Sequence, residues 1–285
     1  MTHINVVIAL FSMGSATQML SNQETGTTLE DRAKPYLAAA LAAGNDFVSV
    51  SAASGLPNLA PESLASAFGP SLASRTEIGT APYPTSLGGI SMQIVDSAGA
   101  SRQAQLLYVS PTQINYLVPS GTAAGAATTN IVNGTGNVPS GTVQIQTVAP
   151  ALFTANGNGQ GVVAATAYRT VIPTTLATPL PVFQCNDGPG TCVSVPIAFG
   201  VDTPIFATFY ATGLRGRSSD SAVTLTIGGQ RMTIRSITPA DSSTLSAGID
   251  QVLAGLNLSL RGSGEVDVTI GVDGKTSNTG RVNFQ

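Results

Sequence analysis

Two cysteines are the residues whose chemistry is easiest to assign. Cys185 and Cys192 enclose NDGPGT, and the only histidine is His3, so a zinc site would lack ligands. The six intervening residues also exclude a C-x-x-C redox motif. The sequence therefore predicts a local disulfide that closes a Gly-Pro turn, which by loop entropy stabilises by about 2.5 kcal/mol. A disulfide indicates an oxidising compartment, hence the periplasm or the exterior.

The other polar side chains form no catalytic or metal-binding pattern. A serine–histidine–aspartate triad would have to use a histidine far from the rest of the chain. Glu265 and Asp267 share one face of a predicted strand, as expected for a solvated surface. Asp267, Asp273 and Asn278 lack the spacing of a known calcium loop. The glycine-rich segment 156–161 precedes an apolar run instead of a helix with a lysine, so a phosphate loop is only weakly indicated. We expect no catalytic residue, cofactor or metal.

Charged residues make up only 9% of the 285 residues, far below the usual quarter. Serine, threonine, asparagine, glutamine, glycine and alanine take their place. With a formal net charge of −3, the chain has no basic surface to neutralise phosphates, so nucleic acid is excluded as a partner. A neutral surface rich in hydroxyl groups suits a protein that packs against copies of itself or lies outside the cell.

The chain contains an internal repeat whose segments keep their order. Four pairs of segments recur: SLASAFGPSL with IFATFYATGL (63–72 and 205–214), AQLLYVSP with MTIRSITP (104–111 and 232–239), INYLV with LNLSL (114–118 and 256–260), and VNG…SGTVQIQ with VDG…TGRVNFQ (132–146 and 272–285). An ordered repeat of this kind predicts two copies of one structural unit.

From Phe47 onward, short apolar strands alternate with turn residues, which is typical of antiparallel sandwiches. We predict an all-β fold of two tandem immunoglobulin-like β-sandwich domains, with an N-terminal extended arm and one short helix. The predicted parts are the arm with its apolar strand, linker and helix (1–46), a first sandwich (47–150), and a second sandwich (151–285) with a cysteine-clipped insertion near 167–200. The predicted strands are 47–51, 63–68, 89–95, 103–109, 113–118, 127–132 and 142–148, then 205–210, 222–227, 231–237, 255–260, 265–271 and 280–285.

The repeat also predicts the two cores. The first is expected to hold Leu64, Ile94, Leu106, Ile114 and Val118. Their counterparts in the second are Phe206, Ile227, Ile234, Leu256 and Leu260.

Residues 4–16, INVVIALFSMGSA, are the most apolar stretch, and two interpretations remain open. One is a signal-peptide core cleaved at Ala16, although no lysine or arginine precedes it. The other, which we favour, is a retained arm that fits a groove of its own sandwich or a neighbour's. One face would carry Ile4, Val6, Ile8 and Leu10, and the other Val7, Ala9 and Phe11. A strand apolar on both faces must be buried on both, and the run is too short to span a bilayer.

A short helix follows the arm. Thr27 and Glu30 have the spacing of a capping box, and Pro35 predicts a break or a second start. Gly44 is suited to end the alanine- and leucine-rich run that follows. We expect this helix to be a spacer or a plug between the two domains.

Two strings resemble a known family. YVSPTQINYLVP (108–119) and APALFTANGNGQG (149–161) are similar to the paired C-terminal module of secreted Solibacter and other Acidobacteria proteins. The resemblance covers about residues 47–285 and implies tandem sandwiches of the IPT/TIG kind and an exported location. It implies no known reaction and no functional residue. The cysteine-clipped insertion departs from the family pattern.

Two N-x-[ST] sequons start at Asn133 and Asn257. Asn133 is a candidate glycan site because it begins a predicted Asn-Gly hairpin tip, which is exposed. Asn257 is expected within a paired strand, where a glycan would not fit.

The sequence favours a structural function over an enzyme. We expect a subunit of an extracellular fibre or pilus-like filament, assembled head-to-tail by donor-strand addition of the arm to copies of itself. The alternative is a secreted adhesin that binds carbohydrates or surfaces, with surface glycans as partners. The absence of tryptophan and an aromatic content of 5% disfavour stacking on sugars.

Overall fold

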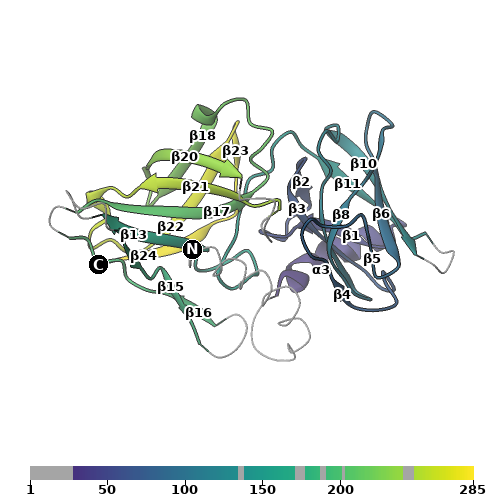
Figure 1. Ribbon diagram of the computed structural model, residues 1–285, viewed down its shortest axis with the longest axis horizontal. Helices are drawn as coiled ribbons and strands as arrows, with labels where there is room; N and C mark the ends of the chain where they lie inside the picture. The colour runs from purple at the N-terminus through teal and green to yellow at the C-terminus, as the bar shows by residue number, and fades with distance from the viewer. Residues whose placement is uncertain (1–27, 134–137, 171–176, 187–190, 201–202, 240–246) are drawn as a thin grey trace.

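The computed structural model describes residues 28–133, 138–170, 177–186, 191–200, 203–239 and 247–285. Most of the regular structure is β, and two sandwiches lie side by side along the longest axis of the molecule (Figure 1). The first sandwich contains strands β1 to β11, and the second contains β12 to β24. The prediction of an all-β sandwich fold is confirmed. The predicted arm residues, Ile4, Val6, Val7, Ile8, Leu10 and Phe11, lie outside the described residues.

The two sheets of the first sandwich face each other across one core. One sheet has the order β1 (Val48–Ser51), β3 (Leu64–Phe68), β9 (Gln113–Leu117), β8 (Gln105–Val109) and β4 (Glu77–Ile78). The other has the order β2 (Asn58–Leu59), β11 (Ser140–Ile145), β10 (Gly125–Asn133), β6 (Ile90–Val95) and β5 (Ser86–Leu87), and β7 (Ser101–Gln103) also pairs with β6. Alternate side chains such as Ala65, Tyr116 and Met92 point inward and fill the core.

The second sandwich has a corresponding pair of sheets. One has the order β14 (Ala177–Leu180), β13 (Ala165–Thr170), β17 (Ile205–Thr212), β21 (Asp250–Gly255) and β20 (Thr233–Pro239), with β12 (Ala151–Leu152) on the end of β17. The other contains β19 (Gln230–Arg231), β18 (Val223–Ile227), β22 (Gly264–Val272), β23 (Lys275–Thr276) and β24 (Gly280–Phe284). A separate hairpin consists of β15 (Phe183–Cys185) and β16 (Cys192–Ser194).

The strand order is the same in both sandwiches. The sheet β1-β3-β9-β8 corresponds to β13-β17-β21-β20, and β11-β10-β6 with β7 corresponds to β24-β22-β18 with β19. Taken in chain order, these are the A-B-E-D and G-F-C sheets of an immunoglobulin-type sandwich. The hairpins β8–β9 and β20–β21 also share a bulge, between Leu106 and Tyr108 and between Ile234 and Ser236. The repeat in the sequence is therefore a repeat of the fold.

One segment of the predicted repeat is out of register by four residues. Ala67 on β3 and Phe209 on β17 are matched positions of the repeat. Ile114 on β9 lies opposite Ala67 and Val252 on β21 lies opposite Phe209, so β21 is the strand equivalent to β9. The predicted strand 255–260 is wrong: β21 ends at Gly255, and Leu258–Leu260 form a 3-10 helix. Asn115 and Asn257 do not occupy equivalent positions, because Asn257 is the N-cap residue of that 3-10 helix and does not lie within a strand.

The predicted core residues are buried with two exceptions. Ile94, Leu106, Ile114, Val118, Ile227, Leu256 and Leu260 are all buried in the predicted cores. Leu64 is also buried, but it lies in the cluster between the two sandwiches and not in the first core, which contradicts the prediction. Phe206 and Ile234 are only partly buried, which contradicts the prediction. Phe206 points away from its own core, because the inward positions of β17 are those of Ala207 and Phe209. It stacks on Tyr168 with ring centroids 5.6 Å apart, and the Arg235 guanidinium lies 5.9 Å from its centroid.

The insertion is shorter than predicted. The sequence predicts an insertion from about residue 167, but residues 165–170 form β13, which pairs with β17 in the main sheet. Ala165 and Ala167 are buried in the second core. The short alternation of small residues in this strand gives a weak strand signal, which explains the error.

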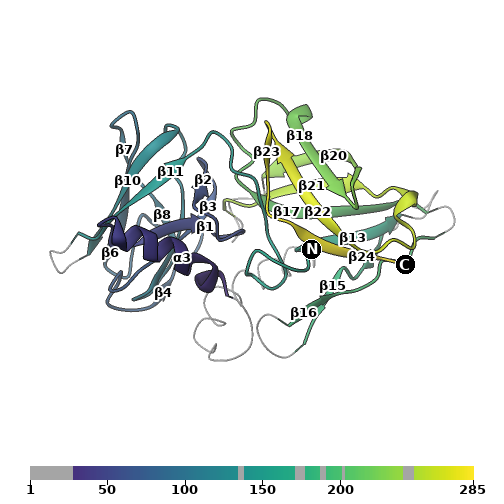
Figure 2. The ribbon, with the colours of Figure 1, turned by 180° about the vertical axis from the view of Figure 1, so that it is seen from behind.

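The helix α3 (Leu29–Ala42) corrects three predictions. Its N-cap is Thr28 and not Thr27, and the capping box uses Asp31 and not Glu30: the Asp31 N–H donates to Thr28 Oγ1 at 3.0 Å. Pro35 lies inside the helix without ending it. The helix is not a plug between the sandwiches, because Leu29 and Ala33 pack against Val48, Val50 and Phe68 on the outer face of β1 and β3 (Figure 2). Gly44, with a φ of +82°, follows the helix end as expected.

Candidate functional site

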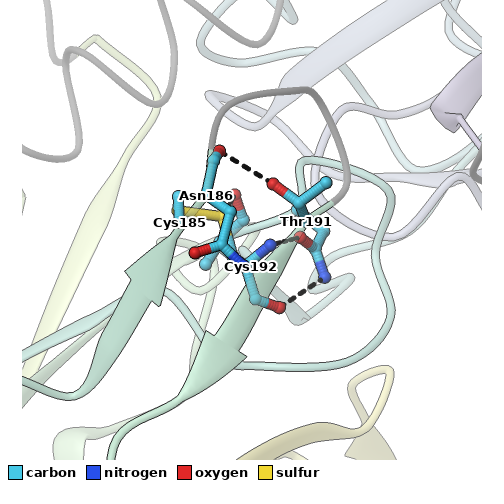
Figure 3. The surroundings of a disulfide bond; sticks show 6 residues. Cys185, Asn186, Thr191 and Cys192 are labelled. Carbon is cyan, nitrogen blue, oxygen red and sulfur yellow. Dashed lines mark hydrogen bonds between the residues drawn. A yellow bond between two sulfur atoms is a disulfide. The ribbon is translucent and has the colours of Figure 1, made fainter.

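The predicted disulfide is present and confirms the prediction for Cys185 and Cys192 (Figure 3). The two cysteines are direct partners across the antiparallel hairpin β15–β16. The Thr191 hydroxyl donates to the Asn186 carbonyl at 2.9 Å beside the bond. The disulfide therefore closes a local hairpin.

This hairpin is docked on the glycine-rich segment 156–161. Asn156 accepts from the Cys192 N–H at 2.8 Å and donates to the Cys192 carbonyl at 3.3 Å, as a strand would. Ala155, Val162 and Phe183 pack against Cys192. The hairpin is therefore held on this segment by two hydrogen bonds, which join the Asn156 side chain to the backbone N–H and carbonyl of Cys192.

The same segment is a structural loop and not a phosphate site. The N–H groups of Gly157 and Gly159 bond to Thr154, and the Gly159 carbonyl accepts from Asn278 at 2.9 Å. The loop leads into β13 and not into a helix, so it lacks the dipole that favours phosphate. Gly159 has a φ of +74°, and a Cβ there would lie within 2.8 Å of the Ala53 and Ser54 carbonyl oxygens. The loop is therefore fitted against the first sandwich.

An apolar junction joins the two sandwiches. It is a buried cluster of side chains from both sides: Ala53, Leu64, Tyr83, Leu107, Ala151, Phe153, Ala164, Tyr210, Ala247 and Ile249. A hydroxyl reinforces it, since Thr212 Oγ1 accepts from the Leu64 N–H at 2.9 Å and donates to the Gly248 carbonyl at 2.6 Å. The sheet β1-β3-β9-β8 is consequently buried on both faces, which explains its nearly continuous burial pattern.

A partly buried ion cluster borders this junction, and sequence analysis missed it. Arg215 donates through Nε to Asp250 at 2.9 Å and through a terminal nitrogen to Glu62, on the first sandwich, at 3.3 Å. The Asp250 side chain is only 3% exposed. Burial raises the pKa of Asp250, and the Arg215 guanidinium and the Leu214 N–H oppose part of that rise. The sequence did carry one signal for this cluster: charged residues are so few that each is a candidate for an ion pair with another.

The remaining predicted polar groups are dispersed over the second sandwich. Glu265 and Asp267 are exposed on β22, and each lies 3.6 Å from Arg281. Asp273 bonds to Ser218, and Asn278 bonds to both backbone groups of Leu152. The three candidate calcium ligands therefore lie in separate interactions. Among the described ranges, no group of three His, Cys, Asp or Glu residues is placed to hold a metal ion.

The motif at 108–119 has a structural use. Ser110 and Gln113 form a closed turn, in which each backbone N–H reaches the other residue. Asn115 Oδ1 accepts from Ser66 at 2.8 Å and from Gln113 at 2.7 Å, and all three side chains are buried. This network ties β9 to β3 on the outward face of the sheet.

The candidate glycan residue Asn133 is the last residue of β10, and the next residues, 134–137, lie outside the described residues. Asn257 has an exposed neighbour in Leu258 and donates to the Arg231 carbonyl at 3.4 Å. The expectation that Asn257 lies within a paired strand is wrong.

Asp96 organises one end of the first sandwich. Its carboxylate accepts from the N–H groups of Ala98 and Ala100 within the β6–β7 hairpin and from Ala123 on a neighbouring turn. It also pairs with Arg102. These bonds, first of all the one from the Ala123 N–H, lower the pKa of Asp96.

We therefore expect Asp96 to make the free energy of unfolding fall at acidic pH. A folded pKa below the unfolded value stabilises the fold above about pH 4, and this contribution is lost as the pH falls through the folded pKa. Asp96→Asn removes the titrating group, so urea unfolding at pH 7 and pH 3 should show a smaller acid loss in the variant than in the unmodified chain. Equal losses in both proteins would contradict this role.

Comparison with protein-family models gave no match, and comparison with curated proteins gave none either. The likeness to the Acidobacteria module therefore stays a prediction. Within the part of the chain that the structure describes, no helix is long and apolar enough to cross a membrane. The fold defines the class as an all-β protein of duplicated immunoglobulin-type sandwiches, stapled by a disulfide and joined through a buried junction.

Proposed function

We propose that this chain is a structural subunit of an extracellular fibre or pilus-like filament. Subunits would assemble head-to-tail, with residues 4–13 of one chain adding as a donor strand to the next. The disulfide supports a location outside the cytosol, where such bonds persist. The neutral, hydroxyl-rich composition supports contact with further copies.

The junction is the observation that carries this proposal. Tandem sandwiches connected only by a linker would swing independently, which is the default expectation for small polar interfaces. Here a buried apolar cluster, a backbone-to-hydroxyl bond and an ion pair to Glu62 connect the two. A subunit built this way would transmit tension along its length.

Deleting residues 1–13 is expected to give a folded chain that does not polymerise. Residues after Asp46 form the described strand pairings and supply the side chains of the two described sandwich cores. Negative-stain microscopy and size-exclusion chromatography of the full chain and the deletion would measure this. A full chain that stays monomeric would contradict the proposal, and glycan-array binding by that monomer would support the adhesin alternative.

A point variant gives a matched control for the deletion. Ile8→Lys places a charge in the centre of the apolar run and should abolish filaments, whereas Thr17→Lys adds the same charge to the polar linker and should preserve them. Loss of filaments in both variants would mean that charge alone, and not the arm, governs assembly.

A further inference from the structure

The same strand edge is covered in one sandwich and open in the other. In the first sandwich the outer edge of β8 is paired by β4, with Glu77 opposite Val109. Beyond that pair, the Gly79 N–H donates to the Leu107 carbonyl and the Leu106 N–H donates to the Pro84 carbonyl, both at 2.8 Å. Residues 77–84 thus complete this edge of the sheet.

The covering segment belongs to the connection between β3 and β6, residues 69–89. That connection also closes the side of the sandwich, because it contributes Leu72, Ala73 and Leu87 to the first core. Strand β5 in the same connection pairs with β6. The first sandwich therefore supplies its own cover for both the backbone edge and the core.

The second sandwich has no such cover in the described ranges. Its equivalent connection, residues 213–222, is shorter and contains a single 3-10 turn, Asp220–Ala222. Strand β20 pairs with β21 on one side, and no described residue pairs with it on the other. A pocket of about 300 Å³ lies beside it, lined by Asp220, Ser221, Val223, Thr224, Arg231, Met232, Ile234, Arg235, Ser236 and Ile237. Figure 1 shows β20 and β18, which border this pocket, on the second sandwich.

We infer that the outer edge of β20, with this pocket, is the acceptor site for residues 4–13 of a second copy; the inference rests on the proposed function. The arm would run antiparallel to β20, as β4 runs to β8. Ile234 and Ile237, partly buried against the second core, face the side chains that Ile4, Val6, Ile8 and Leu10 would bring.

The shared bulge makes the correspondence specific. In β8, the bulge at Leu107 leaves the Leu106 N–H and the Leu107 carbonyl directed outward, where residues 77–84 bond to them. The equivalent groups in β20 are the Ile234 N–H and the Arg235 carbonyl. A bulge and a charged residue usually discourage edge pairing, but the first sandwich pairs across the same bulge.

The opposite edge of the same sheet is a poorer acceptor. Strand β14 is mostly exposed, and Pro179 lacks the N–H that a ladder needs. Residues 4–13 carry no charge and can pair along an edge that has a pocket beside it, as β20 does. The structure thus favours β20 over β14.

The described chain begins on one sandwich, and the acceptor edge belongs to the other. The chain enters the described structure at α3, which packs on the first sandwich, while β20 belongs to the second. The residues between Met13 and Gly26 reach about 45 Å when extended. A contact between unlike surfaces of this kind is head-to-tail, and it continues into a filament where successive additions do not close on themselves.

Photo-crosslinking of the full chain tests the acceptor directly. Ile8→Cys, labelled with a benzophenone maleimide, is mixed with isotope-labelled chains that lack the substitution, allowed to assemble and irradiated. Peptides that join position 8 of one chain to residues 223–239 of the other isotope are expected. Filaments whose crosslinks fall on another edge, or within one chain, would overturn the acceptor and leave the filament proposal standing. A chain that forms no filaments would overturn both.

A pair of lysine variants gives an independent measurement. Ile237→Lys puts a charge into the acceptor pocket and should abolish filaments, whereas Thr178→Lys on the exposed face of β14 should not. Circular dichroism and thermal unfolding establish that each variant folds. Equal filament yields from both folded variants would overturn the acceptor at β20. If Ile237→Lys does not fold, the crosslinking result decides.

Discussion

Replacing Phe209 by alanine is expected to lower the free energy of unfolding by about 3–5 kcal/mol, the usual cost of removing a fully buried aromatic ring. Phe206→Ala, three positions earlier on the same strand, should cost about 1 kcal/mol. Phe209 is 1% exposed at the centre of the second core. Phe206 faces outward and is only partly buried, so its replacement removes contacts with Tyr168 and Arg235 and opens no core cavity.

The two variants remove the same side chain from the same strand, so β-propensity cancels between them. Urea unfolding at neutral pH, with the two variants and the unmodified chain measured side by side, gives the difference. The expected order is a large loss for Phe209→Ala and a small one for Phe206→Ala. Equal losses, or the reverse order, would mean that the inward and outward faces of β17 are exchanged.

This pair also shows how far the sequence alone predicts the fold. Alternation and turn residues predict most of the strands and the immunoglobulin-type class, because period-two patterning and tight turns are local properties; the strand 255–260 and β13 are the exceptions. The face of β17 was harder to predict, because apolar residues occupy both sides of that strand. Leu64 and Phe206 occupy equivalent outward positions, and only Leu64 is covered by the other sandwich.

The slipped segment of the repeat has a packing explanation. In the first core, Tyr116 on β9 supplies the large ring, opposite Ala65 and diagonal to Ala67 on β3. In the second core the sizes are exchanged, with Phe209 on β17 and Ala254 on β21. Total volume is kept while the residue types at each position are not, and cores tolerate such exchanges. An alignment by residue identity cannot detect an exchange of large and small side chains between two strands.

The candidate functional regions were predicted unevenly for a related reason. The disulfide follows from two cysteines with no other use, so the sequence was sufficient. The connection 69–89 contains β4, which covers the edge of β8, and the connection 213–222 contains no such strand. The open edge of β20 is therefore visible only when the two sandwiches are compared. Likewise, Arg215 and Asp250 are 35 residues apart and meet only in three dimensions.

Arg215→Ala is expected to destabilise the chain by about 3–5 kcal/mol, because it leaves a buried carboxylate without its partner. Asp250 would keep one neutral donor, the Leu214 N–H, and the bond from Arg215 to Glu62 across the junction would be lost. Arg75→Ala is the matched control. Arg75 pairs with Glu77 and the two side chains are 65% and 41% exposed, so its removal should cost at most about 1 kcal/mol.

The pH dependence of Arg215→Ala separates this mechanism from a simple loss of packing. Burial raises the pKa of Asp250, and removing the guanidinium raises it further. A carboxyl group with a raised folded pKa penalises the folded state when it is ionised, so the penalty is full above the folded pKa and shrinks as the pH falls through it. The difference in unfolding free energy between Arg215→Ala and the unmodified chain should therefore be smaller at pH 4 than at pH 7. Adding Asp250→Asn to Arg215→Ala should remove this pH dependence, since an amide does not titrate. A penalty that is the same at both pH values would show that Arg215 stabilises the junction through its stem and not through its charge.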